Sequence, residues 1–567
     1  MRRLLLSFVL LLPLAITACA PALPATGPEA AATAPGPGAG APPSATPAGD
    51  PFAITGSLRE EWMPLLKLPV IDPAKTRLLA PPAGLAPPSA GCAAYAARKG
   101  EGRAKCADPA TALAALDGAL AVTDVEKRDG ALADLEACAG LPAGVARALR
   151  AELLPMECGE ALAEPLLKAP PAGMNGLVYH ALLGQAVASR LSRAAHGPPQ
   201  LALPHDRQRV LEFVKGPMRA WFEEQSRAIE EVSAAAAELP YYGKGIAAIE
   251  AGIADLRLVE AVRSAPIPDE FAKDDELKNA YYGNLDQWLD PRKNRGRDAA
   301  LAGLKELAMV GVLHDARVDR ARALLSRLYG GRRVDALDAL LVPPLPKAAP
   351  ANVEERLAGA LPTLYAGLLL DERAATRPGT LRMLLDRGLP LPQRAALRSV
   401  TLGPEVTALY ARARLDLGRV YWRAMDFDQA ASLAAAARAA APSDEVAFVL
   451  ALALALRNGP DDAADMMRKA PRTFTSAETP ALDLLARQPG RLAGLSGFDA
   501  AMVHQLAAPE NAGPAYWNDV ARRFQAAAAV LTDPAQRAAA EARARASEAL
   551  ARAVADLEPT GKPGAKK

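Results

Sequence analysis

The sequence predicts an all-α protein built from helical hairpins. Hydrophobic residues make up 51% of the 567 residues and aromatic residues only 5%, and much of the apolar content is alanine, the best helix former. Amphipathic stretches with helical spacing recur between proline and glycine breaks, whereas alternating strand-like segments are almost absent. Roughly 500 residues follow the N-terminal region, which indicates two to four domains or one extended helical array.

The N-terminal residues 1–18 have the three parts of a secretory signal peptide. A short basic stretch, Arg2-Arg3, precedes the apolar run Leu4–Leu14, and small residues follow it. The apolar run is shorter than the roughly 20 residues that a membrane-spanning helix needs. The segment ends in Ile16-Thr17-Ala18-Cys19, which resembles the lipobox of bacterial lipoproteins.

This resemblance implies that the Cys19 thiol is acylated, that cleavage makes Cys19 the first mature residue, and that the chain is anchored to a membrane by lipid. Attachment by more than one acyl chain is stable, because each buried methylene adds about 0.8 kcal/mol. In this family a residue other than aspartate after the cysteine favours the outer membrane, so Ala20 predicts an outer-membrane protein facing the periplasm. The alternative interpretation is an ordinary secretory signal with a cysteine at its cleavage site by chance.

Charge and composition describe the two ends of the mature chain. Removal of the two signal-peptide arginines leaves 64 basic and 64 acidic residues, so no global positive charge favours nucleic acid as a partner. Residues 19–52 are rich in Ala, Pro and Gly and predict a disordered, lipidated spacer. The basic residues 559–567 predict a disordered tail.

The body between these ends is predicted to form four helical regions, 53–200, 201–345, 351–475 and 476–558. Proline-rich residues 343–350 are the predicted linker between two main halves. Apolar stripes at Leu301–Val312 and Ala321–Leu325 predict a helical hairpin.

Two helix starts carry their own capping signals. Asn352 with Glu355 predicts a capping box ahead of a helix over residues 357–370. Asp533-Pro534 predicts the start of a long helix that ends near Glu558.

Four cysteines remain after Cys19, namely Cys92, Cys106, Cys138 and Cys158. The oxidising periplasm favours disulfides, and four cysteines allow three connectivities. We predict Cys92–Cys106 and Cys138–Cys158, because each pair closes a short local segment. The alternative is four buried thiols. Since no pair is spaced C-x-x-C, the sequence indicates neither a redox motif nor a zinc ribbon.

Residues 411–444 carry apolar and small residues at the spacing of a helix–turn–helix repeat of about 34 residues. This pattern resembles a tetratricopeptide repeat (TPR), and it predicts a TPR-like α-solenoid over residues 351–475. The matching positions are Leu417, Gly418, Tyr421, Ala430, Ala437 and Pro442.

The resemblance implies a role for each matching position. The small residues let the paired helices approach closely, Leu417 and Tyr421 fill the seam between them, and Asp426–Asp428 occupies the turn. The sequence departs from the family at Arg414 and Ala434, where aromatic residues are usual. A second, degenerate unit begins near Glu445; it keeps Phe448 and Ala464 but has Leu452 where a small residue is usual. The alternative is a helical hairpin with coincidental spacing.

The TPR resemblance also implies a groove that binds a peptide, helix or protein partner. Arg412, Arg419 and Arg423 on the first helix are the candidate groove residues. The alternative is that these arginines belong to an ordinary solvated helix face.

Two aromatic clusters stand out in a chain with few aromatic residues. Tyr241-Tyr242 and Tyr281-Tyr282 are each followed by glycine, and Trp288 follows the second pair. They indicate a weak internal duplication or a binding surface, because Tyr and Trp are enriched in contact hot spots. The alternative, which we favour, is that their rings pack between helices.

The sequence contains no recognisable catalytic or metal-binding motif. None of the five histidines forms an H-E-x-x-H pair, and no nucleophile elbow, P-loop or dinucleotide fingerprint occurs. His196 and His205 are predicted to be loop residues, and the carboxylates near Trp221 a solvated helix face. We predict no catalytic residue, no metal and no cofactor.

These observations favour a non-enzymatic adaptor or scaffold that binds one or more cell-envelope proteins. The alternatives are an all-helical hydrolase of peptidoglycan or polysaccharide, and a lipoprotein that binds a glycan or a small ligand.

Overall fold

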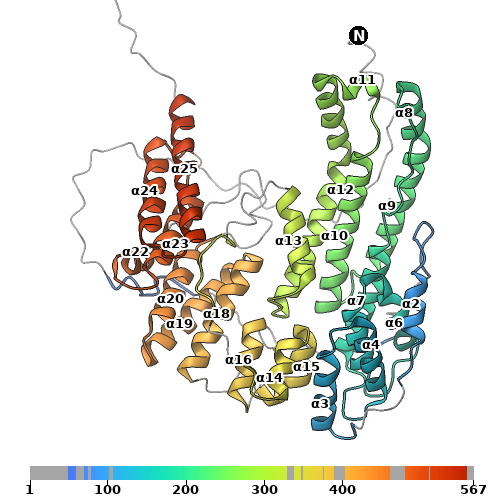
Figure 1. Cartoon of the computed structure of the whole chain (residues 1–567), viewed down its shortest axis with the longest axis horizontal. Helices are drawn as coiled ribbons and strands as arrows, with labels where there is room; N and C mark the ends of the chain where they lie inside the picture. The colour runs from blue at the N-terminus through green and yellow to red at the C-terminus, as the bar shows by residue number, and fades with distance from the viewer. Residues whose placement is uncertain are drawn as a thin grey trace, which may run out of the picture. The chain divides into compact units, whose positions relative to one another are not determined.

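The computed structural model describes residues 49–58, 69–73, 78, 80–100, 106–328, 337–345, 349–374, 376–388, 403–459, 479–509 and 511–557. Over these residues the fold is all-α, as the sequence predicts (Figure 1). The only β-type pairing in this part of the chain is an isolated bridge between Val312 and Gly388. The predicted signal peptide, Cys19, all but the last residues of the spacer, and the C-terminal tail lie outside the described residues.

The N-terminal region consists of short helices, of which α5, η2 and α6 pack on the longer helix α7. Its buried side chains include both ends of each disulfide. The elements are α2 (Ala90–Ala97), α3 (Pro109–Leu120), α4 (Val125–Asp134), η1 (Leu135–Ala137), α5 (Val145–Leu153), η2 (Met156–Cys158), α6 (Gly159–Lys168) and α7 (Gly176–Ser192).

The four cysteines form two disulfides, Cys92–Cys158 and Cys106–Cys138, so the predicted connectivity is wrong. Loop length alone favoured local pairs, but tertiary packing decides which cysteines meet. Helix α2 packs against η2 and α6, which places the Cα atoms of Cys92 and Cys158 4.8 Å apart. A backbone hydrogen bond of 3.0 Å from Gly140 to the Cys106 carbonyl holds the other two cysteine segments side by side.

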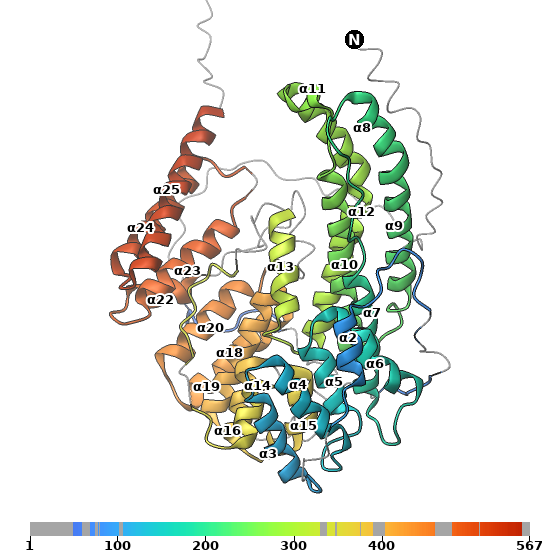
Figure 2. The same cartoon turned by 45° about the vertical axis from the view of Figure 1, so that its right-hand side comes forward.

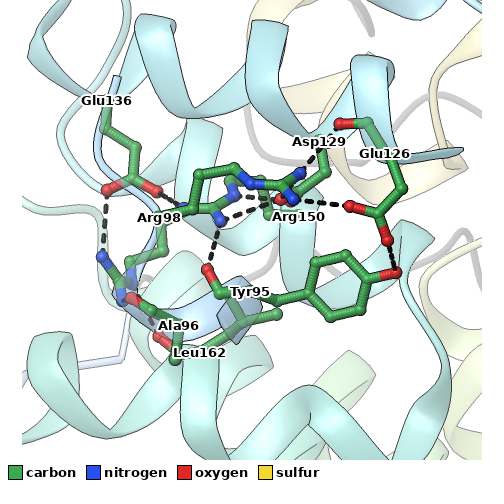
Figure 3. A network of polar contacts seen from close by, with 9 residues as sticks. Tyr95, Ala96, Arg98, Glu126, Asp129, Glu136, Arg150 and Leu162 are labelled. Carbon is green, nitrogen blue, oxygen red and sulfur yellow. Dashed lines mark hydrogen bonds and ion pairs between the residues drawn. The ribbon is translucent and has the colours of Figure 1, made fainter. Parts of the chain in front are cut away.

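A buried charge network lies among these short helices (Figure 3). The fully buried Arg150 donates through Nε to Asp129 at 2.7 Å, and its Nη1 pairs with Glu136. Its Nη2 donates to the carbonyl of Tyr95, while Arg98 reaches Asp129 from the outside at 2.9 Å. The network therefore links α2, α4, η1 and α5 through charges that are neutralised by carboxylates.

The central region is dominated by long helices, α10 and α12 above all, which lie side by side in both views (Figures 1 and 2). Glycines allow this contact, since a Cβ on Gly252 would lie only 2.6 Å from the carbonyl oxygen of Gly296. The elements are α8 (Arg207–Phe213), η3 (Val214–Met218), α9 (Arg219–Ala234), α10 (Tyr241–Arg263), α11 (Asp269–Ala272), α12 (Asp275–Met309) and α13 (Ala316–Leu328).

The predicted hairpin of this region is present, with a difference. Helices α12 and α13 pack together, but α13 also packs on α10. Val312, which the sequence assigned to the first stripe, lies beyond the end of α12 and forms the bridge to Gly388. None of the helices in the described ranges is both long and apolar enough for a membrane span.

The C-terminal helices follow one another in chain order, and most of them pack on the next (Figure 2). The elements are α14 (Val353–Ala360), α15 (Thr363–Ala374), α16 (Pro378–Arg387), α18 (Pro404–Tyr421), α19 (Ala424–Ala440), α20 (Asp444–Leu456), α22 (Pro480–Arg487), α23 (Ala493–Leu506), α24 (Pro514–Val530) and α25 (Pro534–Leu557).

Both predicted helix starts are confirmed. Asn352 accepts a hydrogen bond from the Glu355 amide, and Asp533 accepts from Ala535 and Gln536 at the start of α25. The predicted helix over residues 357–370 is instead two helices, because Pro362 interrupts it between α14 and α15.

Helix α18 lies between the two largest apolar cores of the described residues. One core extends from Cys92 to Tyr421 and includes α14, α15 and α16, so it continues on both sides of residues 343–350. The other contains α19, α20 and the helices α22 to α25. Two segments distant in the sequence also contribute buried residues to it: Phe52 from residues 50–58, and Leu337 and Leu340 from residues 337–345.

Candidate functional site

The hairpin of α18 and α19 has the close contact that the small residues predict. A Cβ on Gly418 would lie 2.6 Å from the ring of Phe427 in α19, and Ala430 and Ala437 are at most 1% exposed. The chain reverses at Trp422, whose φ of 58° is left-handed. The predicted turn, Asp426–Asp428, lies inside α19 instead, because Trp422 already completes the reversal.

Two residues of α18 have different roles from those that the repeat pattern implies. Leu417 and Tyr421 pack in the first core rather than with the alanines of α19. The Tyr421 hydroxyl donates to the Val312 carbonyl at 2.8 Å, and burial raises the pKa of Tyr421 well above its ordinary value. These side chains therefore attach the hairpin to the turn after α12.

Arg414, the departure from the repeat pattern, has a partner inside the hairpin. Its Nη1 lies 2.9 Å from Asp426, and the two side chains are 1% and 0% exposed. Arg423, one of the predicted groove residues, also pairs with Asp426 at 3.2 Å. Arg423 is therefore engaged in the turn of the hairpin.

The second repeat-like unit is described only in part. Pro442 follows the end of α19, and Ser443 caps α20 by accepting from the Val446 amide. Phe448 and Leu452 of α20 are fully buried. Ala464 lies outside the described residues.

The other two predicted groove residues, Arg412 and Arg419, bind the backbone of a distant segment of the same chain. Arg412 Nη1 donates to the Pro343 carbonyl at 2.6 Å. Arg419 donates to the Leu337 carbonyl at 3.1 and 3.2 Å and to the Leu340 carbonyl at 3.3 Å. Asp416 lies between the two arginines and pairs with both, which fixes their orientation.

The same segment is also held from α23 and by two leucine anchors. Asp499 Oδ1 accepts the Leu341 amide hydrogen at 2.8 Å. Leu337 and Leu340 are 1% and 4% exposed and belong to the second core. Burial raises the pKa of Asp499 to about 7, although the Leu341 amide and the nearby Arg419 act to lower it.

A second segment outside the helices, residues 50–58, is held in a similar way on α19 and α20. Arg457, at the end of α20, donates to the carbonyls of Thr55 at 2.6 Å and Ser57 at 3.0 Å. The guanidinium of Arg438 lies 4.1 Å above the ring of Phe52. Two segments far apart in the sequence are therefore both held by arginines that donate to main-chain carbonyls.

The predicted tyrosine clusters lie in different environments. Tyr242 is buried, and its hydroxyl donates to Glu152 at 2.7 Å while accepting from Arg317 at 2.6 Å. Burial raises the pKa of Tyr242 well above its ordinary value. Tyr241 is half-buried at the start of α10.

The second cluster lies on α12. Tyr281 meets Tyr282 edge to face and Phe271 at a tilted angle, and Trp288 packs on Phe222 while remaining 47% exposed. The glycines that follow the two tyrosine pairs also differ. A Cβ on Gly243 would lie 2.1 Å from the His180 carbonyl, whereas Gly283 has open space around it. The two triplets therefore do not form one surface.

The histidines do not converge on a site among the described residues. His196 and His205 each contact a backbone carbonyl four residues earlier in the chain. His196 lines a cavity of about 370 Å³ beside Arg257, whose Nη1 is already engaged by carbonyls of the α7 end. In the same described ranges, the group of cysteine and acidic side chains close enough to share an ion is Cys92, Glu157 and Cys158, and its sulfurs are joined in a disulfide.

No protein-family model, curated protein or solved structure matches this chain. The features that bear on function are therefore those of the chain itself. Of these, the surface formed by α18 and α23, which we call the α18–α23 surface, is defined by Arg412, Asp416, Arg419 and Asp499. The helical spacing in the sequence predicts its arginines, whereas neither Asp499 nor the segment that they bind has a signal in the sequence.

Proposed function

We propose that this chain is a lipid-anchored adaptor of the cell envelope that binds short non-helical segments of partner proteins on its C-terminal helices. The observation that carries the proposal is the set of hydrogen bonds from Arg412 and Arg419 to main-chain carbonyls. Every peptide presents such carbonyls, so a surface that binds them accepts segments of varied sequence and takes its specificity from side-chain pockets.

Three further features support the proposal. The leader with Cys19 is consistent with export and lipid attachment. The two disulfides are consistent with an oxidising compartment. Small residues allow α18 and α19 to pair closely, as helical-repeat units do when they stack to form a binding surface.

The location is tested by metabolic labelling with a palmitate analogue in a bacterial host. The native chain should carry label and sediment with membranes, and Cys19→Ser should carry none. Label on the Cys19→Ser variant, or an unlabelled native chain free in the cytoplasm, would contradict the proposal.

The adaptor role is tested by site-specific photo-crosslinking in cells. A photoreactive residue replaces Glu405, which is exposed in the first turn of α18, two helical turns before Arg412. A control replaces Lys168, which is 73% exposed on α6. We expect a discrete envelope protein crosslinked at position 405 and not at 168. Equal capture at both positions, or none at 405, would argue against it.

A further inference from the structure

We propose that residues 337–345 are an internal ligand of the α18–α23 surface. A partner then binds by replacing them with a segment of the form Leu-x-x-Leu-x-x-Pro that forms the same turn between its two leucines. This inference rests on the proposed adaptor function, and it adds to it the state of the free protein and the chemistry of the partner segment.

The polar contacts that the α18–α23 surface makes with the internal segment are to the backbone of that segment. Carbonyls of Leu337, Leu340 and Pro343 accept from arginines, and the Leu341 amide donates to Asp499. None of these contacts depends on the identity of the side chain. A segment from another protein can therefore make the same hydrogen bonds.

The side-chain contacts define which segments fit. Leu337 and Leu340 are the members of the segment that enter the second core as buried residues. Ala339, Leu341 and Val342 are only half-buried against it. The spacing of the two leucines, with Pro343 three residues further on, therefore specifies the ligand, while the intervening positions tolerate change.

One side chain of the segment is directed elsewhere. The Asp338 carboxylate pairs with Arg322 of α13 at 2.7 Å and is 46% exposed. Arg322 is only 13% exposed, so this pair also ties the segment to α13. On the α18–α23 surface itself the segment is held by two leucines and four backbone groups, which a competing ligand can supply.

Because the internal segment is part of the same chain, it competes more effectively for the surface than a separate peptide does. A tethered ligand acts at an effective concentration in the millimolar range. A free peptide of the same sequence should therefore bind the native chain weakly and bind tightly once the internal segment is weakened. An ordinary structural linker would leave no binding site behind when it is weakened, so the two cases are distinguishable.

The experiment uses the full-length acylated chain in detergent and a fluorescent peptide with the sequence of residues 337–345, followed by anisotropy. The variant Leu337→Ser/Leu340→Ser weakens the internal segment. We expect it to bind the peptide about tenfold or more tightly than the native chain does. Adding Arg412→Met and Arg419→Met should abolish this gain, and a peptide with both leucines replaced by serine should not bind.

Equal or absent binding by a folded Leu337→Ser/Leu340→Ser variant would overturn the inference. Folding of the variant is checked by circular dichroism. If it does not fold, the native chain is tested with millimolar peptide that carries a photoreactive group at the position of Val342. Crosslinks within α18 or α23 support the inference, and crosslinks elsewhere or none overturn it.

The two proposals can fail separately. Failure of the adaptor function appears as an absent crosslink at position 405 in cells, whatever the peptide does. Failure of the internal-ligand inference appears as absent peptide binding in vitro, even when a cellular partner is captured.

Discussion

Arg150 in the N-terminal region and the two arginines of the α18–α23 surface are used in two different ways. Around α5, the guanidinium of Arg150 is enclosed by the carboxylates of Asp129 and Glu136, with one further hydrogen bond to the Tyr95 carbonyl. On α18, Arg412 and Arg419 donate instead to backbone carbonyls of a separate segment. The first arrangement is specific and buried, so it locks one packing of helices. The second recognises groups that every peptide has, so its occupant can be exchanged.

Two buried acidic residues, one in each region, differ in whether a guanidinium pairs with them. Burial acts to raise the pKa of Glu160, but hydrogen bonds from Arg190 and Arg193 outweigh it and hold the value below the ordinary one. Among the described residues no guanidinium donates to Asp499, and burial raises its pKa to about 7. The N-terminal region therefore neutralises its buried charge, while the C-terminal surface retains one that is costly to ionise.

The largest expected loss of stability comes from replacing Arg150 in the buried charge network of the N-terminal region. Arg150→Met leaves Asp129 and Glu136 without the central cation, and removal of one partner from a buried pair costs about 3–5 kcal/mol. Urea unfolding should show this loss. The control Arg545→Ala, at an exposed pair of 3.9 Å on α25, should change stability little. Similar losses in both variants would contradict the comparison.

The disulfides should give the next largest effect, confined to the same region. Cys92→Ser/Cys158→Ser opens a link between positions 66 residues apart and should cost about 3 kcal/mol. Hydrogen exchange should speed up over α2 to α7 and stay unchanged over α18 to α25. A non-reducing digest should recover Cys92 joined to Cys158; recovery of Cys92 joined to Cys106 would refute the connectivity.

The pH dependence of stability should have opposite signs in the two regions. The pKa of Asp499 in the folded chain lies above its value in the unfolded chain. This residue therefore lowers the free energy of unfolding more and more as pH rises from about 4 to about 7. The folded pKa of Glu160 is lowered, so its stabilising contribution is lost only as pH falls through the acid range.

Asp499→Asn isolates the C-terminal contribution. The amide oxygen can still accept the Leu341 hydrogen, and no charge is buried. We expect the melting temperature to rise by roughly 2–4 °C at pH 8 and to change little at pH 5. Thermal scans at the two pH values measure this, and a destabilised variant at pH 8 would be the contrary result.

The smallest effect concerns the segment at residues 50–58. Arg438→Ala removes the cation above the Phe52 ring, an interaction of about 0.5–1 kcal/mol. Limited proteolysis near Phe52 should become faster, while the disulfide-linked helices keep their protection. Unchanged cleavage would show that Arg438 does not hold this segment.

Local signals in the sequence were sufficient for the fold class and for several helix starts. Alanine content, Asn352 and Asp533 act through neighbouring residues, so their effects could be predicted. Pro362 was present in the sequence as well, and its interruption of the predicted helix was the missed local signal.

Only part of the candidate site, its arginines, could be predicted from the sequence. Spacing on α18 identified Arg412 and Arg419, but their partners are Leu337 to Pro343, which are distant in the sequence. Asp499 gave no signal, because its burial depends on packing between α23 and this segment. The disulfide connectivity and the unlike environments of Gly243 and Gly283 likewise depend on helix contacts that spacing does not encode.

Hydrogen exchange on the native chain is the most direct test of whether the α18–α23 surface holds an exchangeable segment. Millimolar peptide with the sequence of residues 337–345 is added, and exchange of the chain's own residues 337–345 is followed by mass spectrometry. The account predicts faster exchange there, with no change at residues 50–58 or around Arg150. Unchanged exchange at residues 337–345 under saturating peptide would contradict it.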